Sequence, residues 1–126
     1  MSESCPFCNL PRDRIIDSDE LGLVIRDGYP ISPGHTLIIP KWHIASFFDL
    51  SIKEQDGLFE LMARAKEVLL KTFNPDGFNV GINDVPSAGQ TVPHIQIHLI
   101  PRFKDDQEDA RGGVRWIIPD KARYWE

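Results

Sequence analysis

The sequence lacks an excess of basic residues and any long apolar run. Its 14 Lys and Arg residues are outnumbered by 19 Asp and Glu residues, giving a formal net charge of −5 and a pI near 5.3. Because nucleic acids and anionic membranes attract basic surfaces, neither is an expected partner. No stretch of about 18 apolar residues is present, so we expect no membrane-spanning segment. The polar first 14 residues have no apolar core of a secretory signal, and we expect a cytoplasmic protein.

Chain length and composition favour one soluble domain. The 126 residues suit a single domain with one modest core, so we expect residues 1–126 to form one unit. The 41% hydrophobic and 26% charged content is ordinary for a globular protein. Within this unit, we treat residues 1–14 as a separate N-terminal segment and residues 103–126 as a charged, loop-like C-terminal tail.

One helix is predicted clearly, between residues 51 and 77. Ser51 and Glu54 have the spacing of a capping box, and the Asn-Pro-Asp-Gly sequence at 74–77 ends the helix. Apolar residues recur at helical spacing between these ends, so one face must pack against something, most simply a sheet. These apolar residues are Leu58, Leu61, Met62, Ala65, Val68 and Leu69.

The remaining sequence indicates short strands separated by turns. Strands are predicted at 21–27, 35–41, 78–84 and 94–101, and a short final strand at 114–119. The connecting segments are too short for repeated crossovers between parallel strands. The pattern therefore predicts an α+β fold with a mainly antiparallel sheet.

The two cysteines, Cys5 and Cys8, form the only cysteine pair, in the sequence "CPFC". Such a pair can be a redox dithiol, although only four residues precede Cys5, too few for the strand that normally leads into that motif. It can also be half of a zinc site whose other two ligands come from elsewhere, with histidines as the available donors. Spacing alone leaves both interpretations open, together with two unligated thiols.

A second unusual segment is "TVPHIQIHLIPR", residues 91–102. His94, Gln96 and His98 alternate with apolar residues, so a strand would place these three side chains on one face and the apolar ones on the other. His35, His43, Asp27 and the "SAGQT" loop at 87–91 each have an ordinary structural interpretation when taken alone. Backbone amides in such a loop can hold a phosphate, but the signal is weak.

Taken together, "GHTLIIPKWHI", "GQTVPHIQIHLIPR" and the acidic helix between them resemble the histidine triad superfamily of nucleotide hydrolases and transferases. The "RGGVRWIIPDKARYW" sequence near the C-terminus is similar to bacterial members. The resemblance implies a five-stranded antiparallel sheet with one long helix. It also implies a homodimer with a continuous ten-stranded sheet. The implied ligand is a purine nucleotide, a dinucleoside polyphosphate or a phosphoramidate.

The resemblance also implies roles for individual residues. His98 matches the third histidine of the triad, which contacts the phosphate or bridging oxygen, and His35 matches a histidine that supports it by hydrogen bonding. Asp27 matches the residue that holds the ribose. The residues that match the phosphate-binding strand end and loop are Asn83, Gly89, Gln90 and Thr91.

Family members with an N-terminal Cys-x-x-Cys bind a structural zinc ion, and the resemblance extends to all four ligand positions. Here these positions are Cys5, Cys8, His43 and His94. Two sulfurs and two imidazoles would form a closed tetrahedral site, which is typical of structural zinc.

Gln96 departs from the family pattern because it occupies the position of the histidine that attacks the α-phosphorus. A carboxamide nitrogen cannot be that nucleophile, since its lone pair is delocalised into the carbonyl. Three hypotheses follow: a hydrolase impaired by loss of its nucleophile, a non-catalytic nucleotide sensor, or hydrolysis through His98 or an activated water. Outside the family, the alternative is a redox protein that uses Cys5 and Cys8.

Overall fold

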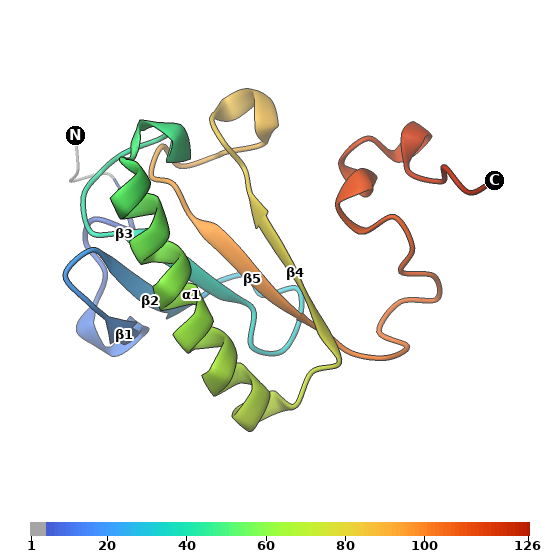
Figure 1. Ribbon diagram of the computed structural model, residues 1–126, viewed down its shortest axis with the longest axis horizontal. Coiled ribbons are helices and arrows are strands. Elements are labelled where there is room, and N and C mark those ends of the chain that lie inside the picture. Colours follow the sequence, from blue (N-terminus) through green and yellow to red (C-terminus); the bar gives the residue numbers. More distant parts are fainter. Residues whose placement is uncertain (1–4) are drawn as a thin grey trace.

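The computed structural model describes residues 5–126, so the first four residues of the expected zinc-binding segment lie outside the described part. Its strands and single α-helix are β1 (Ile15–Ser18), β2 (Gly22–Arg26), β3 (Thr36–Pro40), α1 (Ile52–Phe73), β4 (Gly77–Ile82) and β5 (Ile97–Arg102). The strands form one five-stranded sheet in the order β1-β2-β3-β5-β4, and every neighbouring pair is antiparallel (Figure 1). The predicted α+β fold with an antiparallel sheet and one long helix is confirmed.

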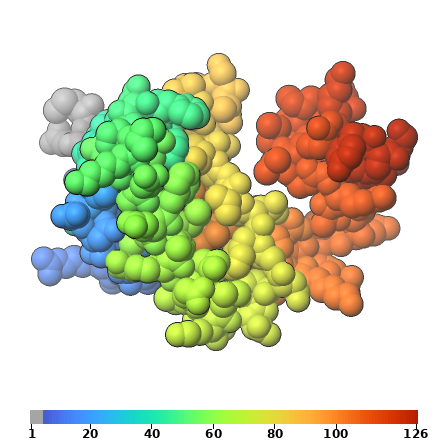
Figure 2. All heavy atoms as spheres, in the orientation of Figure 1, coloured from blue at the N-terminus to red at the C-terminus, as the bar shows by residue number. Residues whose placement is uncertain are grey.

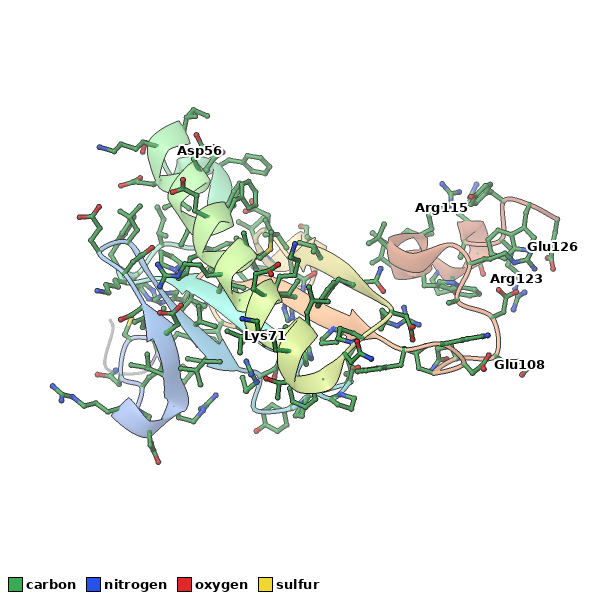
Figure 3. The ribbon with its side chains drawn as sticks, turned by 60° about the horizontal axis from the view of Figure 1, so that its bottom comes forward. Asp56, Lys71, Glu108, Arg115, Arg123 and Glu126 are labelled. Atoms are coloured by element: carbon green, nitrogen blue, oxygen red, sulfur yellow. The ribbon has the colours of Figure 1, made fainter. Side chains whose placement is uncertain are left out.

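Helix α1 begins and ends as the sequence predicts. The Ser51 hydroxyl accepts a hydrogen bond from the Glu54 backbone N–H, and the Glu54 carboxylate accepts one from the Ser51 backbone N–H. Asn74 ends the helix in the left-handed conformation, where asparagine is tolerated. Glu54 in the first turn and Lys71 in the last turn (Figure 3) complement the helix dipole.

The two faces of the sheet are covered differently. Helix α1 packs across one face of the sheet (Figure 1), and the apolar side chains of β5 on that face belong to the main core. This core comprises Val24, Ile38, Phe47, Leu50, Leu58, Leu61, Ala65, Leu69, Ile95, Ile97 and Leu99. On the opposite face a smaller cluster forms around Ile25, Leu37 and Ile39. His98 lies on this second face, because it pairs with Leu37 across the ladder.

Three details differ from the predicted strands. Strand β5 begins at Ile97 and not at residue 94, because the Ile95 backbone N–H bonds to the Ile44 carbonyl instead of a neighbouring strand. Strand β1 was not predicted from the pattern, since it has only four residues. The strand predicted at 114–119 is wrong: a 3₁₀ helix forms at Gly113–Ile117. The positive φ angles of Gly112 (94°) and Gly113 (46°) turn the chain there.

The C-terminal tail extends beyond β4 and lies to one side of the sheet (Figure 1). It contains 3₁₀ helices at Gly113–Ile117 and Pro119–Lys121. Within the described residues, no helix combines the length and apolarity that crossing a bilayer would require.

Candidate functional site

Two cysteines and two histidines converge at one end of the sheet. The sulfur–nitrogen distances are 3.4 Å from Cys5 Sγ to His94 Nδ1, 3.4 Å from Cys8 Sγ to His94 Nδ1, and 3.3 Å from Cys8 Sγ to His43 Nδ1. All four candidate ligand atoms lie within 4.8 Å of one another. In a tetrahedral zinc site with ordinary bond lengths, sulfur and nitrogen ligands are about 3.5 Å apart. The four residues therefore fit a zinc ion, and they are the four expected from the sequence.

The protonation of His94 also suits a metal ligand. Its Nε2 lies 2.9 Å from the Pro40 carbonyl oxygen, which can only accept, so Nε2 carries the proton. The Nδ1 lone pair therefore faces the two sulfurs, and a hydrogen bond from the other ring nitrogen to a carbonyl normally orients a ligating histidine in this way. Burial lowers the pKa of His94, which keeps the ring neutral. Burial and the nearby Cys5 thiol raise the pKa of Cys8, and a bound cation is what would hold both sulfurs as thiolates.

A second cluster, made of Asp27, His35 and His98, lies on the sheet face opposite the helix. His35 Nε2 is 3.0 Å from His98 Nδ1 and 3.3 Å from Asp27 Oδ2. His35 is buried, and its Nδ1 accepts a hydrogen bond of 3.3 Å from the Ile31 backbone N–H. Burial lowers the pKa of both histidines, and for His98 the neighbouring His35 lowers it further.

These contacts determine where the protons lie. Because the Ile31 N–H donates to His35 Nδ1, His35 must carry its proton on Nε2. That proton points to His98 Nδ1, which must therefore present a lone pair. A neutral His98 consequently carries its own proton on Nε2, the ring nitrogen that does not face His35. His98 can thus donate a hydrogen bond from Nε2, and it has no nucleophilic lone pair there.

The two clusters differ in their capacity to bind a metal ion. Asp27, His35 and His98 have ligand atoms close enough together to surround an ion. However, a metal on His35 Nε2 would require the proton on Nδ1, directly against the Ile31 N–H. The first cluster is therefore the candidate metal site, and the second is a hydrogen-bonded relay.

Gln96 lies between the two clusters, just before β5 begins. Its side-chain amide donates a hydrogen bond to the His94 carbonyl oxygen, so it is tied to its own chain. The expected row of three side chains is divided in the structure. His94 joins the metal cluster, His98 joins the relay, and half-buried Gln96 stands between them.

The loop after β4 holds the four residues expected at a phosphate. The Gln90 side chain donates to the Ala45 carbonyl at 2.7 Å, and the Gly89 N–H donates to the Pro86 carbonyl at 2.9 Å. These two residues therefore shape the loop. Among residues 5–126, the Asn83 amide and the Thr91 hydroxyl have no hydrogen-bond partner, so both remain available to a ligand.

Sequence reasoning missed two features that matter here. The first is the Ile31 backbone N–H, whose segment is positioned by a 2.6 Å hydrogen bond from the Ser32 hydroxyl to the Pro101 carbonyl. No pattern in "GYPISPG" marks that donor. The second is Val85, which has a φ of 62°, an unusual conformation for a β-branched residue.

The structure thus combines a five-stranded antiparallel sheet with a Cys/His cluster that could hold a metal ion and a pair of hydrogen-bonded histidines on the open sheet face. The HIT domain family model matches residues 10–105, and the chain therefore belongs to the HIT family. A bis(5′-nucleosyl)-tetraphosphatase (asymmetrical) of Schizosaccharomyces pombe is 43% identical over 77 residues, which are 61% of this chain and 42% of that protein. A bis(5′-adenosyl)-triphosphatase of Saccharomyces cerevisiae is 35% identical over 98 residues, 77% of this chain and 45% of the relative.

The chain thus spans less than half the length of these two relatives. Among solved structures, a zinc-bound histidine triad family protein from Mycobacterium smegmatis superposes with a TM-score of 0.75 at 32% identity. That match covers 98% of this chain and 97% of the other. The HIT family assignment from the sequence motifs is therefore confirmed.

Proposed function

We propose that this chain binds a purine nucleotide or dinucleoside polyphosphate on the sheet face that carries Asp27, His35 and His98. The observation that supports this most directly is the proton relay, which leaves His98 with an Nε2–H donor for a phosphate or leaving-group oxygen. The Asn83 amide and the Thr91 hydroxyl supply further donors. The Asp27 carboxylate accepts from the Tyr29 N–H and retains lone pairs for ribose hydroxyls.

Turnover should be low because Gln96 occupies the nucleophile position. Its amide nitrogen can donate a hydrogen bond to a phosphate oxygen but cannot attack phosphorus. His98 does not replace it, since its lone pair faces His35. His35 acts as a positioning residue. The reaction class is hydrolysis at a nucleotide α-phosphate, and a non-catalytic nucleotide sensor is the second candidate, favoured by the absence of an imidazole at position 96.

The test is the Gln96→His variant in a single-turnover assay with a labelled adenylyl substrate and detection of an acid-labile adduct. We expect adduct and turnover in Gln96→His and neither in the unmodified chain or in a Gln96→Asn control. Affinity for AMP should change little, because ground-state contacts are kept. Adduct formation by the unmodified chain at a rate comparable to Gln96→His would contradict the proposal. AMP binding with no activity in either protein would favour the sensor.

We also propose one structural zinc ion per chain, held by Cys5, Cys8, His43 and His94. When bound, zinc would cross-link the N-terminal segment to the loop before β5 and contribute to the folding free energy. The cluster uses both thiols, which argues against a redox pair. Native mass spectrometry should show one zinc ion per chain. A metal-free protein that undergoes reversible dithiol oxidation would favour the redox alternative.

We further propose a symmetric homodimer. Strands β1 and β4 are the edges of the sheet, and unpaired edges need covering. A ten-stranded sheet would result if one edge pairs with its counterpart in a second copy. Sedimentation at micromolar concentration should give twice the chain mass, and a single-chain mass there would contradict this proposal.

A further inference from the structure

The loop between β4 and β5, residues 83–96, is held by one short segment, residues 43–47, which precedes helix α1. Figure 2 shows the two side by side: the green residues before α1 touch the yellow residues of the loop. Hydrogen bonds and the Cys/His cluster join the two segments. Because the loop carries the donors that the proposed function assigns to phosphate, the contacts that hold the loop also determine where those donors lie.

Asp84 makes a charge-assisted contact at the start of the loop. The Ser46 hydroxyl donates to Asp84 Oδ2 at 2.9 Å, and the Phe47 backbone N–H donates to Asp84 Oδ1 at 2.7 Å. Hydrogen bonds to an ionised carboxylate are roughly twice as strong as those between neutral groups. Both carboxylate oxygens are engaged, so the half-buried Asp84 side chain is fixed in one orientation.

Gln90 holds the other end of the loop. Its side-chain amide donates to the Ala45 carbonyl at 2.7 Å. The same short segment therefore holds the loop at two points, Asp84 and Gln90. Asn83 directly precedes the first point, and Thr91 directly follows the second. The two unpartnered donors of the loop are thus each next to a residue that is fixed by segment 43–47.

Val85, next to Asp84, has a backbone conformation that its surroundings must maintain. Its φ of 62° and ψ of 170° lie in a region that is populated almost only by glycine. Such a conformation persists only where the surrounding structure over-determines it. On one side, the Val85 carbonyl accepts from the Ala88 N–H at 3.0 Å. On the other side, the Asp84 carboxylate anchors the chain, and without this anchor Val85 can relax and move the loop.

We propose that Asp84 is a positioning residue for phosphate, which holds the loop so that Asn83 and Thr91 face the ligand. This inference rests on the proposed function, which assigns the phosphate to these donors. Asp84 acts through the loop, because both its oxygens already accept hydrogen bonds from the protein. The proposed ribose residue, Asp27, follows β2 and is held by separate contacts. Asp84 therefore affects the affinity for the phosphate and not the affinity for the nucleoside.

The test compares AMP with adenosine, which lacks the phosphate, by NMR titration of the full chain. Asp84→Ala should weaken AMP binding roughly 10-fold, because the apparent affinity falls with the fraction of chains whose loop is in place. Adenosine binding should not change. Asp84→Asn keeps an acceptor for the Phe47 N–H, and Ser46→Ala removes one of the two donors, so both should give intermediate losses for AMP alone. Asp17→Asn is the matched control, because it neutralises a carboxylate that accepts from Arg64 outside the site.

The outcomes separate this inference from the proposed function. If the unmodified chain binds neither AMP nor adenosine, the proposed function is wrong. Equal losses of both ligands in Asp84→Ala, or no loss of AMP, would overturn the positioning role alone, and Asp84→Asn and Ser46→Ala decide in the same way if Asp84→Ala does not fold. The Phe47 amide proton gives an independent readout. Its signal should move upfield in Asp84→Ala and not in Asp17→Asn, and an unchanged signal would overturn the proposal.

Discussion

Replacing Ile31 with proline should release the proton relay. The substitution removes one backbone N–H, the donor to His35 Nδ1, because proline has none. The residue is 76% exposed, so loss of its side chain costs little packing. Proline already occupies the neighbouring position 30, which indicates that this segment accommodates the ring.

The size of the effect follows from the contact that the N–H enforces. With Ile31 present, a proton on His35 Nδ1 would meet a second donor 3.3 Å away, leaving the buried His35 ring nitrogen without an acceptor. Such a loss costs about 1–3 kcal/mol, a bias of roughly 5- to 150-fold towards the Nε2–H form. In Ile31→Pro this contribution disappears, and the Asp27 carboxylate, 3.3 Å from His35 Nε2, is the remaining group that favours a proton there. His35 can then carry its proton on Nδ1 and accept from a proton on His98 Nδ1.

The assay is ¹⁵N NMR of the histidine ring nitrogens near pH 7.5, where both rings are neutral. We expect His35 and His98 as Nε2–H forms in the unmodified chain and a mixture in Ile31→Pro. Ile31→Ala keeps the backbone N–H and should match the unmodified chain. An Nδ1–H form of His98 in the unmodified chain would refute the relay, and no change in Ile31→Pro would refute the role of the Ile31 N–H in setting it.

Three further predictions concern stability. Burial lowers the pKa of His35 and His98, so the unfolded chain takes up protons at a higher pH than the folded chain does. The free energy of unfolding therefore falls as the pH drops below about 6.5, by at most about 1.4 kcal/mol per histidine at pH 5.5. The free energy of unfolding, measured in urea, should therefore decrease less between pH 7.5 and 5.5 for His98→Asn than for the unmodified chain. An equal decrease would count against this prediction. Val85→Gly should stabilise the protein by about 1 kcal/mol, because glycine accepts the φ of 62° without strain. Val85→Ala should give no comparable gain. A lower urea midpoint for Val85→Gly than for the unmodified chain would contradict this prediction. Cys8→Ser should lower both the zinc content and the melting temperature. Once zinc is chelated, the variant and the unmodified chain should have the same melting temperature. Equal melting temperatures with zinc present would contradict the metal site.

Several parts of the fold were predictable because they depend on residues close in sequence. The capping box at Ser51 and Glu54 and the end of the helix at Asn74 are local hydrogen-bonding signals. Alternation at Ile97 and Leu99 placed these residues in the core. The strand at Ile15–Ser18 was not predicted, since four residues carry too little periodicity. The strand predicted at 114–119 failed because its apolar residues have no neighbouring strand, and two glycines turn the chain.

The sequence by itself determined the helix, the antiparallel strands, the family and the missing nucleophile at Gln96, because residue types and short spacings carry that information. Only the tertiary structure decided how His94 and His98 are divided between two clusters. Cys5 contacts His94, which is 89 residues away in the sequence, and His35 contacts His98, which is 63 residues away. The proton positions also depend on folding, since they follow from the Ile31 N–H and the Pro40 carbonyl. A spacing pattern cannot specify these contacts, because each requires two distant segments to reach hydrogen-bonding distance in three dimensions.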